Sequence, residues 1–163
     1  MLALIAGEGK LPAVLVENLP DLPHIASLQG HDPDHLVPDR RFRIEELGTL
    51  LAEFQALGIT EVCFAGSIAR PRIDTSRIDA ATEPLVPRIR AALGKGDDGA
   101  LREVLSIFEE AGMTIRASHE FAAALLPVHA VFTTRKPSSQ NEKDAARAAD
   151  VLARTGILDI GQS

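Results

Sequence analysis

The sequence predicts a three-layer α/β domain with a mostly parallel sheet, followed by a linker helix. Short continuous apolar runs, most of them ended by a glycine, alternate with segments of helical apolar periodicity. Such runs are typical of parallel strands buried on both faces, and their alternation with helices indicates β-α-β connections. The length of 163 residues corresponds to about one domain.

The first half of the chain predicts three strands that alternate with two helices. The strands are expected at residues 2–6, 24–29 and 61–65, and the helices at 11–19 and 46–57. Pro12 stands near the start of the first helix, where its missing N–H is not needed. Gly58 ends the second helix. Residues 31–41 are polar and contain prolines, so they predict a loop.

The second half continues the pattern with shorter elements. A loop is expected at 67–75, helices at 84–93, 121–126 and 142–153, a strand at 113–117 and a short extended piece at 130–133. Asp97 or Asp98 is expected to cap a further helix that ends near Ala111. We therefore expect a Rossmann-like domain over residues 1–133 and a linker helix within residues 134–163.

The composition excludes several classes of protein. With 17 Lys and Arg against 23 Asp and Glu, the net charge is −6, whereas nonspecific nucleic-acid binding needs a basic surface. The single cysteine, Cys63, excludes an intrachain disulfide, fits a reducing compartment and is expected to pack in the core. No apolar stretch approaches the roughly 20 residues of a membrane span, and no signal peptide is present, so we expect a cytoplasmic protein.

The first candidate site is the turn Gly7-Glu8-Gly9-Lys10 between a strand and a helix. Glycines let a backbone approach a ligand, and a helix N-terminus attracts phosphate. The dinucleotide fingerprint is incomplete, because Pro12 replaces its third glycine and the second strand ends without the acid that holds a ribose. A phosphate or sugar site and a plain tight turn are the two interpretations left open.

The second candidate site is the segment Gly66-Ser67-Ile68-Ala69-Arg70-Pro71-Arg72, after the third strand. Ligands of open parallel sheets bind beyond the carboxyl ends of the strands, and this loop is expected beside the first one. An arginine at this place can hold a phosphate through two hydrogen bonds. The alternative is an ordinary surface arginine in a connecting loop.

Three further groups carry ligand-type or nucleophilic side chains. Asp97 and Asp98 could help to hold Mg²⁺ together with substrate phosphates, or could cap a helix. The segment 31–35 holds two histidines and two aspartates, but its proline disfavours a helix and a solvated loop is expected. Ser118 and His119 are sequence neighbours, which seldom form a nucleophile–base pair.

Four short segments occur in order along the chain: Leu-Ile-Ala-Gly-Glu-Gly-Lys-Leu-Pro at 4–12, Ala-Gly-Ser-Ile-Ala-Arg-Pro at 65–71, Gly-Lys-Gly-Asp-Asp at 94–98 and Leu-Asp-Ile-Gly-Gln at 158–162. Together they resemble the bacterial UDP-2,3-diacylglucosamine pyrophosphatases of the LpxI type. The resemblance covers this whole chain but only the N-terminal half, or slightly more, of the family protein.

The resemblance implies hydrolysis of the pyrophosphate of UDP-2,3-diacylglucosamine, in lipid A biosynthesis, to UMP and 2,3-diacylglucosamine 1-phosphate with Mg²⁺ or Mn²⁺. It places the metal ligands and catalysis in a second domain with a Glu-Gly-Thr-Asp segment, which is absent here, and residues 158–162 match the start of that domain. It also implies a homodimer and a peripheral position at the inner membrane. The substrate-binding residues expected in this chain are Gly7, Gly9, Lys10, Gly66, Ser67, Arg70, Asp97, Asp98 and Gln162.

Two other functions fit the same sequence. The chain could be a module that binds a nucleotide or sugar phosphate without turnover. It could also dock onto a protein partner through residues 142–163, which carry exposed apolar side chains if nothing covers them.

Overall fold

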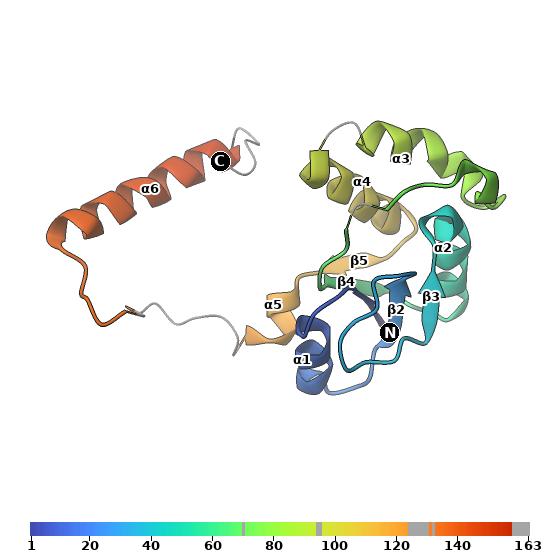
Figure 1. Ribbon diagram of the computed structural model, residues 1–163, viewed down its shortest axis with the longest axis horizontal. Helices are drawn as coiled ribbons and strands as arrows, with labels where there is room; N and C mark the ends of the chain where they lie inside the picture. Colours follow the sequence, from blue (N-terminus) through green and yellow to red (C-terminus); the bar gives the residue numbers. More distant parts are fainter. Residues whose placement is uncertain (70, 94–95, 124–130, 132, 158–163) are drawn as a thin grey trace. The chain divides into compact units, whose positions relative to one another are not determined.

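The computed structural model describes residues 1–69, 71–93, 96–123, 131 and 133–157, apart from the side chains at 93, 96–98 and 156. The chain divides into two units, Met1–Leu126 and Pro127–Ser163. The first unit contains a five-stranded sheet in the order β3-β2-β1-β4-β5 (Figure 1). Every neighbouring pair of strands is parallel. The predicted α/β class is confirmed.

The order in which the chain adds strands to the sheet reverses at β1, the central strand. Its strands are β1 (Leu2–Ala6), β2 (His24–Leu28), β3 (Arg40–Phe42), β4 (Glu61–Ala65) and β5 (Thr114–Arg116). The helices are α1 (Leu11–Asn18), α2 (Leu47–Ala56), α3 (Val86–Leu93), α4 (Gly96–Glu110) and α5 (Ser118–Phe121). From β1 the chain adds β2 and β3 on one side, then returns to add β4 and β5 on the other. The topological switch point, where such sheets bind ligands, therefore lies between β1 and β4.

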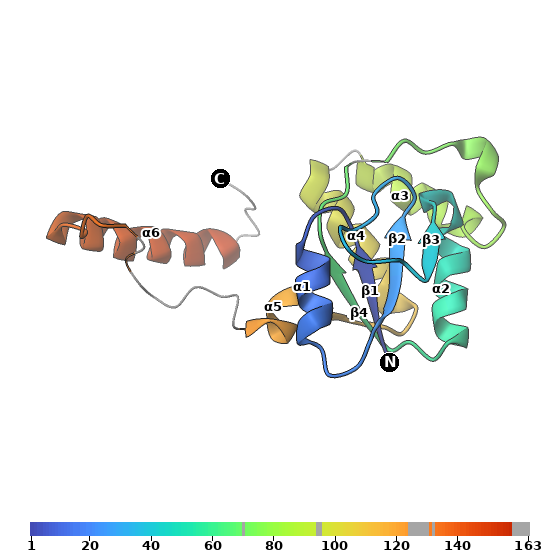
Figure 2. The same cartoon turned by 60° about the horizontal axis from the view of Figure 1, so that its bottom comes forward.

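Successive residues of the central strands point to opposite faces of the sheet. On β1, Ala3 and Ile5 pack in one apolar cluster with α2, α3 and α4. Leu4 and Ala6 pack in a second cluster with α1 and α5. Figure 2 shows these two groups of helices on either side of the sheet. Because helices cover both faces, the central strands β1, β2 and β4 are largely apolar, as predicted.

Strand β3 lies where the sequence predicts only loop, at the end of residues 31–41. Of its three residues only Phe42 is buried, whereas Arg40 and Arg41 are charged and at least partly exposed. The Nε of Arg40 donates to Glu53 of α2 at 2.9 Å, which holds the strand to the helix. β3 pairs only with β2, so it forms an edge of the sheet, where charged side chains are common.

Other element boundaries differ by a few residues. The Glu120 carboxylate accepts the Ala117 N–H at 2.7 Å, so α5 begins at Ser118, earlier than the helix predicted at 121–126. Helix α4 begins at Gly96, which places Asp97 and Asp98 in its first turn instead of at its cap. The extended piece predicted at 130–133 is not a strand at its two described residues, 131 and 133.

The second unit contains one helix, α6 (Ser139–Ile157), within its described residues. It is longer at both ends than the helix predicted at 142–153. The Ser138 hydroxyl accepts the Asn141 N–H at 3.2 Å and starts the helix. Among the helices that the structure describes, none has the length and apolar character needed to cross a membrane. The element expected at 158–163 lies outside the described residues, and the domain boundary at 133/134 stays a prediction.

Candidate substrate-binding site

The loops that follow β1 and β4 pair with each other through their backbones. The Glu8 N–H donates to the Ser67 carbonyl at 2.8 Å, and the Ser67 N–H donates to the Glu8 carbonyl at 2.9 Å. The Gly7 N–H donates to the Ala65 carbonyl at 2.8 Å. Since β1 and β4 flank the switch point, this pairing joins the first two candidate sites at the place where ligands of such sheets bind.

The two glycines of this pairing are required by the contact between the loops. A Cβ on Gly7 would lie 2.5 Å from the Ser67 carbonyl oxygen. A Cβ on Gly66 would lie 2.5 Å from the Gly7 carbonyl oxygen, and Gly66 also has a φ of +94°, which side chains other than glycine disfavour. The sequence suggests that these glycines let a ligand approach the backbone. In the structure it is the backbone of the neighbouring loop that approaches them.

The loop after β2 joins the same edge of the sheet. The Nδ1 of His31 lies 2.7 Å from Glu8 Oε1, and the Asp34 N–H donates to the Gly9 carbonyl at 3.2 Å. The His31 side chain is 19% exposed, so this part of the loop is less solvated than predicted. Three loops, which follow β1, β2 and β4, therefore meet beyond the carboxyl ends of the sheet.

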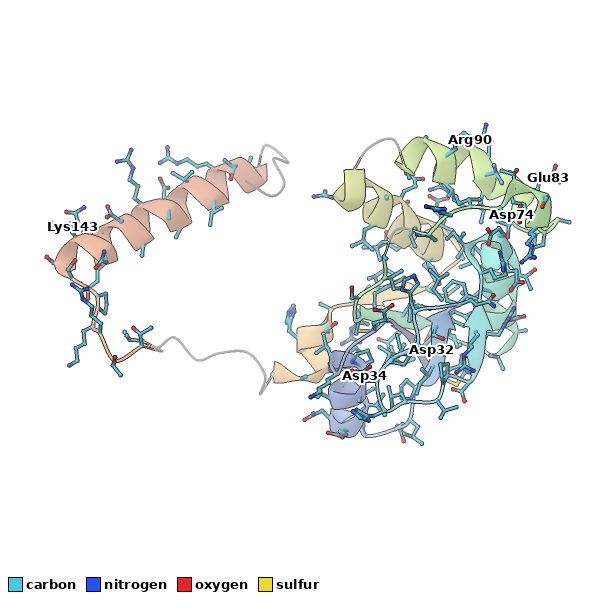
Figure 3. All side chains as sticks on the ribbon, viewed as in Figure 1. Asp32, Asp34, Asp74, Glu83, Arg90 and Lys143 are labelled. Carbon is cyan, nitrogen blue, oxygen red and sulfur yellow. The ribbon has the colours of Figure 1, made fainter. Side chains whose placement is uncertain are left out.

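Asp32 in this loop is already engaged. Its carboxylate accepts the Ser27 hydroxyl at 2.6 Å and the Arg41 Nε at 2.8 Å. The Ser27 hydroxyl, and next the Arg41 guanidinium, hold the pKa of Asp32 below its usual value. Asp32 and Asp34, labelled in Figure 3, come from the segment between β2 and β3. Asp32 serves the fold, and it is not a free acid of the kind that holds a ribose in dinucleotide sites.

A polar pocket of about 250 Å³ opens beside these loops. Its lining residues are Leu28, Gln29, His31, Arg43, Ile44, Glu45, Pro71 and Arg72. Glu45 is buried, pairs with the Arg43 Nε at 3.4 Å and accepts the Asp74 N–H at 2.6 Å. The Arg43 Nη1 donates to Gln29 at 3.4 Å. Glu45 and Gln29 thus hold the Arg43 guanidinium in the wall of the polar pocket.

The polar pocket has the charge that an anionic ligand needs. Arg43, Arg72 and His31 supply cationic or ionisable nitrogens against the single carboxylate of Glu45. Arg72 is exposed, and within the described part of the chain no ion pair engages it. The Arg43 Nε is buried without a hydrogen-bond partner in the described structure. Two guanidinium groups at one wall suit a phosphate or diphosphate.

The structure brings together only some of the residues expected from the sequence. Gly7, Gly9, Gly66 and Ser67 lie in the paired loops, and Lys10 lies exposed directly before α1. Arg70 and Gln162 are outside the described residues, as are the side chains of Asp97 and Asp98. The pocket residues that sequence reasoning missed are Gln29, Arg43 and Glu45, whereas Arg72 is the last residue of the second candidate segment, 66–72. Gln29 directly follows β2, and Arg43 directly follows β3. Their positions at the carboxyl ends of strands could have marked them as candidate site residues.

The other reactive side chains have structural roles. Cys63 is fully buried, as predicted, and burial raises the pKa of its thiol despite a contact with Ser118. The Ser118 hydroxyl donates to the Phe64 carbonyl at 3.1 Å, which fixes the start of α5 against β4. Among the residues that the structure describes, no three His, Cys, Asp or Glu side chains gather as a metal site would require.

Comparison with known proteins identifies the family of this chain. The family model described as LpxI N-terminal domain matches residues 1–125. This chain belongs to the LpxI N-terminal domain family. The matched range covers the Rossmann-like sheet, the paired loops and the polar pocket.

A curated relative of this LpxI-type chain comes from Caulobacter vibrioides and carries the name UDP-2,3-diacylglucosamine pyrophosphatase LpxI. The two sequences are 32% identical over 166 residues. The match covers 99% of this chain and 59% of the relative, so the chain spans about three fifths of the relative's length.

Proposed function

We propose that this chain is the substrate-binding part of a UDP-2,3-diacylglucosamine pyrophosphatase of lipid A biosynthesis. The reaction is hydrolysis of the pyrophosphate, which gives UMP and 2,3-diacylglucosamine 1-phosphate. The observation that carries the proposal is the polar pocket, with two arginines in the segments that follow β3 and β4. The relative's name supplies the substrate, because it names a pyrophosphate-bearing UDP-sugar.

The pocket side chains would bind the diphosphate of the substrate. Arg72 is exposed and reaches the ligand as a cation, while Arg43 is held in place by Glu45 and Gln29. A positioned guanidinium loses little conformational entropy when it binds phosphate. The paired backbone at Gly7, Gly66 and Ser67 would form a rigid wall on the switch-point side.

The remaining expected residues belong to the same proposal. Lys10 and Arg70 would add positive charge near the diphosphate, Gly9 would shape the turn, and Asp97, Asp98 and Gln162 would contact the substrate. A divalent ion, Mg²⁺ or Mn²⁺, would offset pyrophosphate charge and activate water when bound. We place its ligands, with catalysis, in the additional length of the Caulobacter relative. Homodimer formation and peripheral association with the inner membrane, with the chain in the cytoplasm, are further parts of this proposal.

Calorimetric titration of the 163-residue chain tests the proposal. We expect UDP-2,3-diacylglucosamine and UDP to bind, and NAD not to bind. Arg72→Gln should weaken UDP binding about tenfold, since a charge-assisted hydrogen bond contributes about 1.5–3 kcal/mol. Arg77→Gln is the matched control, because Arg77 is an exposed arginine outside the pocket that pairs with Asp74 at 3.4 Å.

The outcomes separate the candidate functions. Equal weakening by the two arginine variants would move the ligand away from the polar pocket. Binding of UDP and other nucleotides without preference for the acylated sugar would favour the non-catalytic module. Release of UMP at full enzymatic rate by this chain would contradict the placement of catalysis elsewhere.

A further inference from the structure

A second, apolar cavity of about 410 Å³ lies next to the polar pocket. The ends of β1, β2 and β4, the loop after β4, and helices α3 and α4 all contribute to its lining. Every lining residue except Glu103 is apolar. Glu103 accepts the Arg88 Nε at 2.6 Å, so its charge is already paired. The apolar cavity therefore offers hydrocarbon contact and almost no hydrogen bonding.

The apolar cavity and the polar pocket are adjacent and share part of their lining. Leu28, Ile44 and Pro71 line both of them. At the cavity wall, Ile68 is 39% exposed and Leu101 is 49% exposed, which leaves large apolar side chains facing solvent. A ligand with an anionic head and a hydrocarbon tail would cover these side chains while its head occupied the polar pocket.

We propose that the apolar cavity binds a fatty acyl chain of the diacylated UDP-sugar. This inference rests on the proposed function and assigns a place to a part of the substrate that the polar pocket cannot hold. The size is adequate, since an apolar cavity of roughly 150 Å³ already accepts benzene. By the same proportion, about 410 Å³ accommodates a hydrocarbon of roughly sixteen carbons.

The chemistry of the lining favours an acyl chain over a peptide. A peptide brings N–H and C=O groups that need hydrogen-bond partners when buried. The apolar cavity supplies only side chains such as Ile89, Val104 and Phe108, besides the paired Glu103. A hydrocarbon chain needs no such partners, and each methylene that it buries contributes favourably.

The test is a titration of the 163-residue chain with UDP and with UDP-2,3-diacylglucosamines of increasing acyl length. We expect affinity to rise up to about fourfold per added methylene until the cavity is full. UDP, which lacks the tail, should bind more weakly than any acylated ligand. If UDP and the long-chain ligand bind with equal affinity, the apolar cavity is not an acyl site, even though the proposed headgroup site would stand.

Two substitutions locate the effect in the cavity. Ala100→Phe on α4 fills it, and Leu101→Asp makes its wall polar; Leu101 is exposed, so the second change is compatible with folding. Both should weaken long-chain binding about tenfold and leave UDP binding within about twofold. The matched control is Ala91→Phe, an exposed alanine of α3 outside the cavity, which should change neither affinity.

The results distinguish this inference from the proposed function. If the unsubstituted chain does not bind UDP, the proposed headgroup site in the polar pocket is wrong. Retained UDP binding with long-chain affinity unchanged by Ala100→Phe and Leu101→Asp overturns the acyl site, and it indicates that another segment of protein covers the cavity. Loss of UDP binding in Ala100→Phe, with the melting temperature unchanged, would also count against a separate tail site.

Discussion

The carbonyl oxygen of Gly7 packs so closely against Gly66 that it leaves no room for a Cβ at position 66. A Cβ on Gly66 would approach this oxygen to 2.5 Å. The contact draws the loops after β1 and β4 together at the switch point of the sheet and aligns the Glu8–Ser67 backbone pairing. The shape of the candidate site therefore depends on the absence of two side chains.

Gly66→Ala should destabilise the domain more than an alanine at another glycine with positive φ. The backbone strain alone is about 1–2 kcal/mol, and the clash with Gly7 adds about 1–3 kcal/mol. Gly112→Ala is the control, because Gly112 has a φ of +89° but no atom within 4 Å of its would-be Cβ. Urea unfolding of the two variants measures the difference. Equal losses of unfolding free energy in the two variants would show that the clash with Gly7 adds no cost.

Acidification should remove stabilisation that depends on Asp79. Burial raises the pKa of Asp79, but hydrogen bonds from the Thr49 hydroxyl at 2.5 Å and from Thr82 outweigh it, so the net pKa is lowered. A carboxyl group with a lowered folded pKa stabilises the protein above its unfolded pKa of about 4 and loses this effect as the pH falls through the folded pKa.

Asp79→Asn should therefore lower the free energy of unfolding at pH 7 by about 1–2 kcal/mol. The unsubstituted protein and the variant should converge in stability as the pH falls below about 4. Asp21→Asn is the control, because Asp21 is exposed and forms no hydrogen bond or ion pair with the described side chains; its stability should run parallel to that of the unsubstituted protein. If the difference in unfolding free energy between Asp79→Asn and the unsubstituted protein stays constant with pH, the Asp79 carboxylate is not the source of this stabilisation.

Glu45 should matter for both stability and ligand binding. Glu45→Ala leaves the Asp74 N–H without its acceptor and the Arg43 guanidinium without its ion-pair partner, which should cost about 2–4 kcal/mol. Glu45→Gln keeps an acceptor and should cost less. Thermal melts compare their stabilities, and UDP titration below the melting temperature should show weaker binding for Glu45→Ala, because Arg43 is no longer held. Unchanged UDP binding would separate Arg43 from the ligand.

Much of the fold could be predicted because its central strands are buried on both faces. Residues 2–6 and 61–65 are apolar enough to identify β1 and β4, and both were placed correctly. Strand β3 was missed because Arg40-Arg41-Phe42 has no apolar run. Its position depends on the Arg40–Glu53 pair and on Phe42 entering the core, which are tertiary contacts that local sequence does not show.

The candidate site could be predicted only in its loops. The segments after β1 and β4 were recognised from glycines that follow strands, and they do lie side by side. Arg43 and Glu45 escaped notice because they follow the missed β3. The apolar cavity forms where the helix pair α3 and α4 packs over the ends of the strands, so no single sequence segment encodes it.

The central claim is that UDP binds in the polar pocket, where the segments after β2, β3 and β4 meet. The most direct test is a titration of the ¹⁵N-labelled 163-residue chain with UDP, followed by amide chemical shifts. We expect the shifts to concentrate at Gly9, Gln29, Ser67 and Arg72, with little change in residues 139–157. Shifts confined to α6, or none at saturating UDP, would contradict the account.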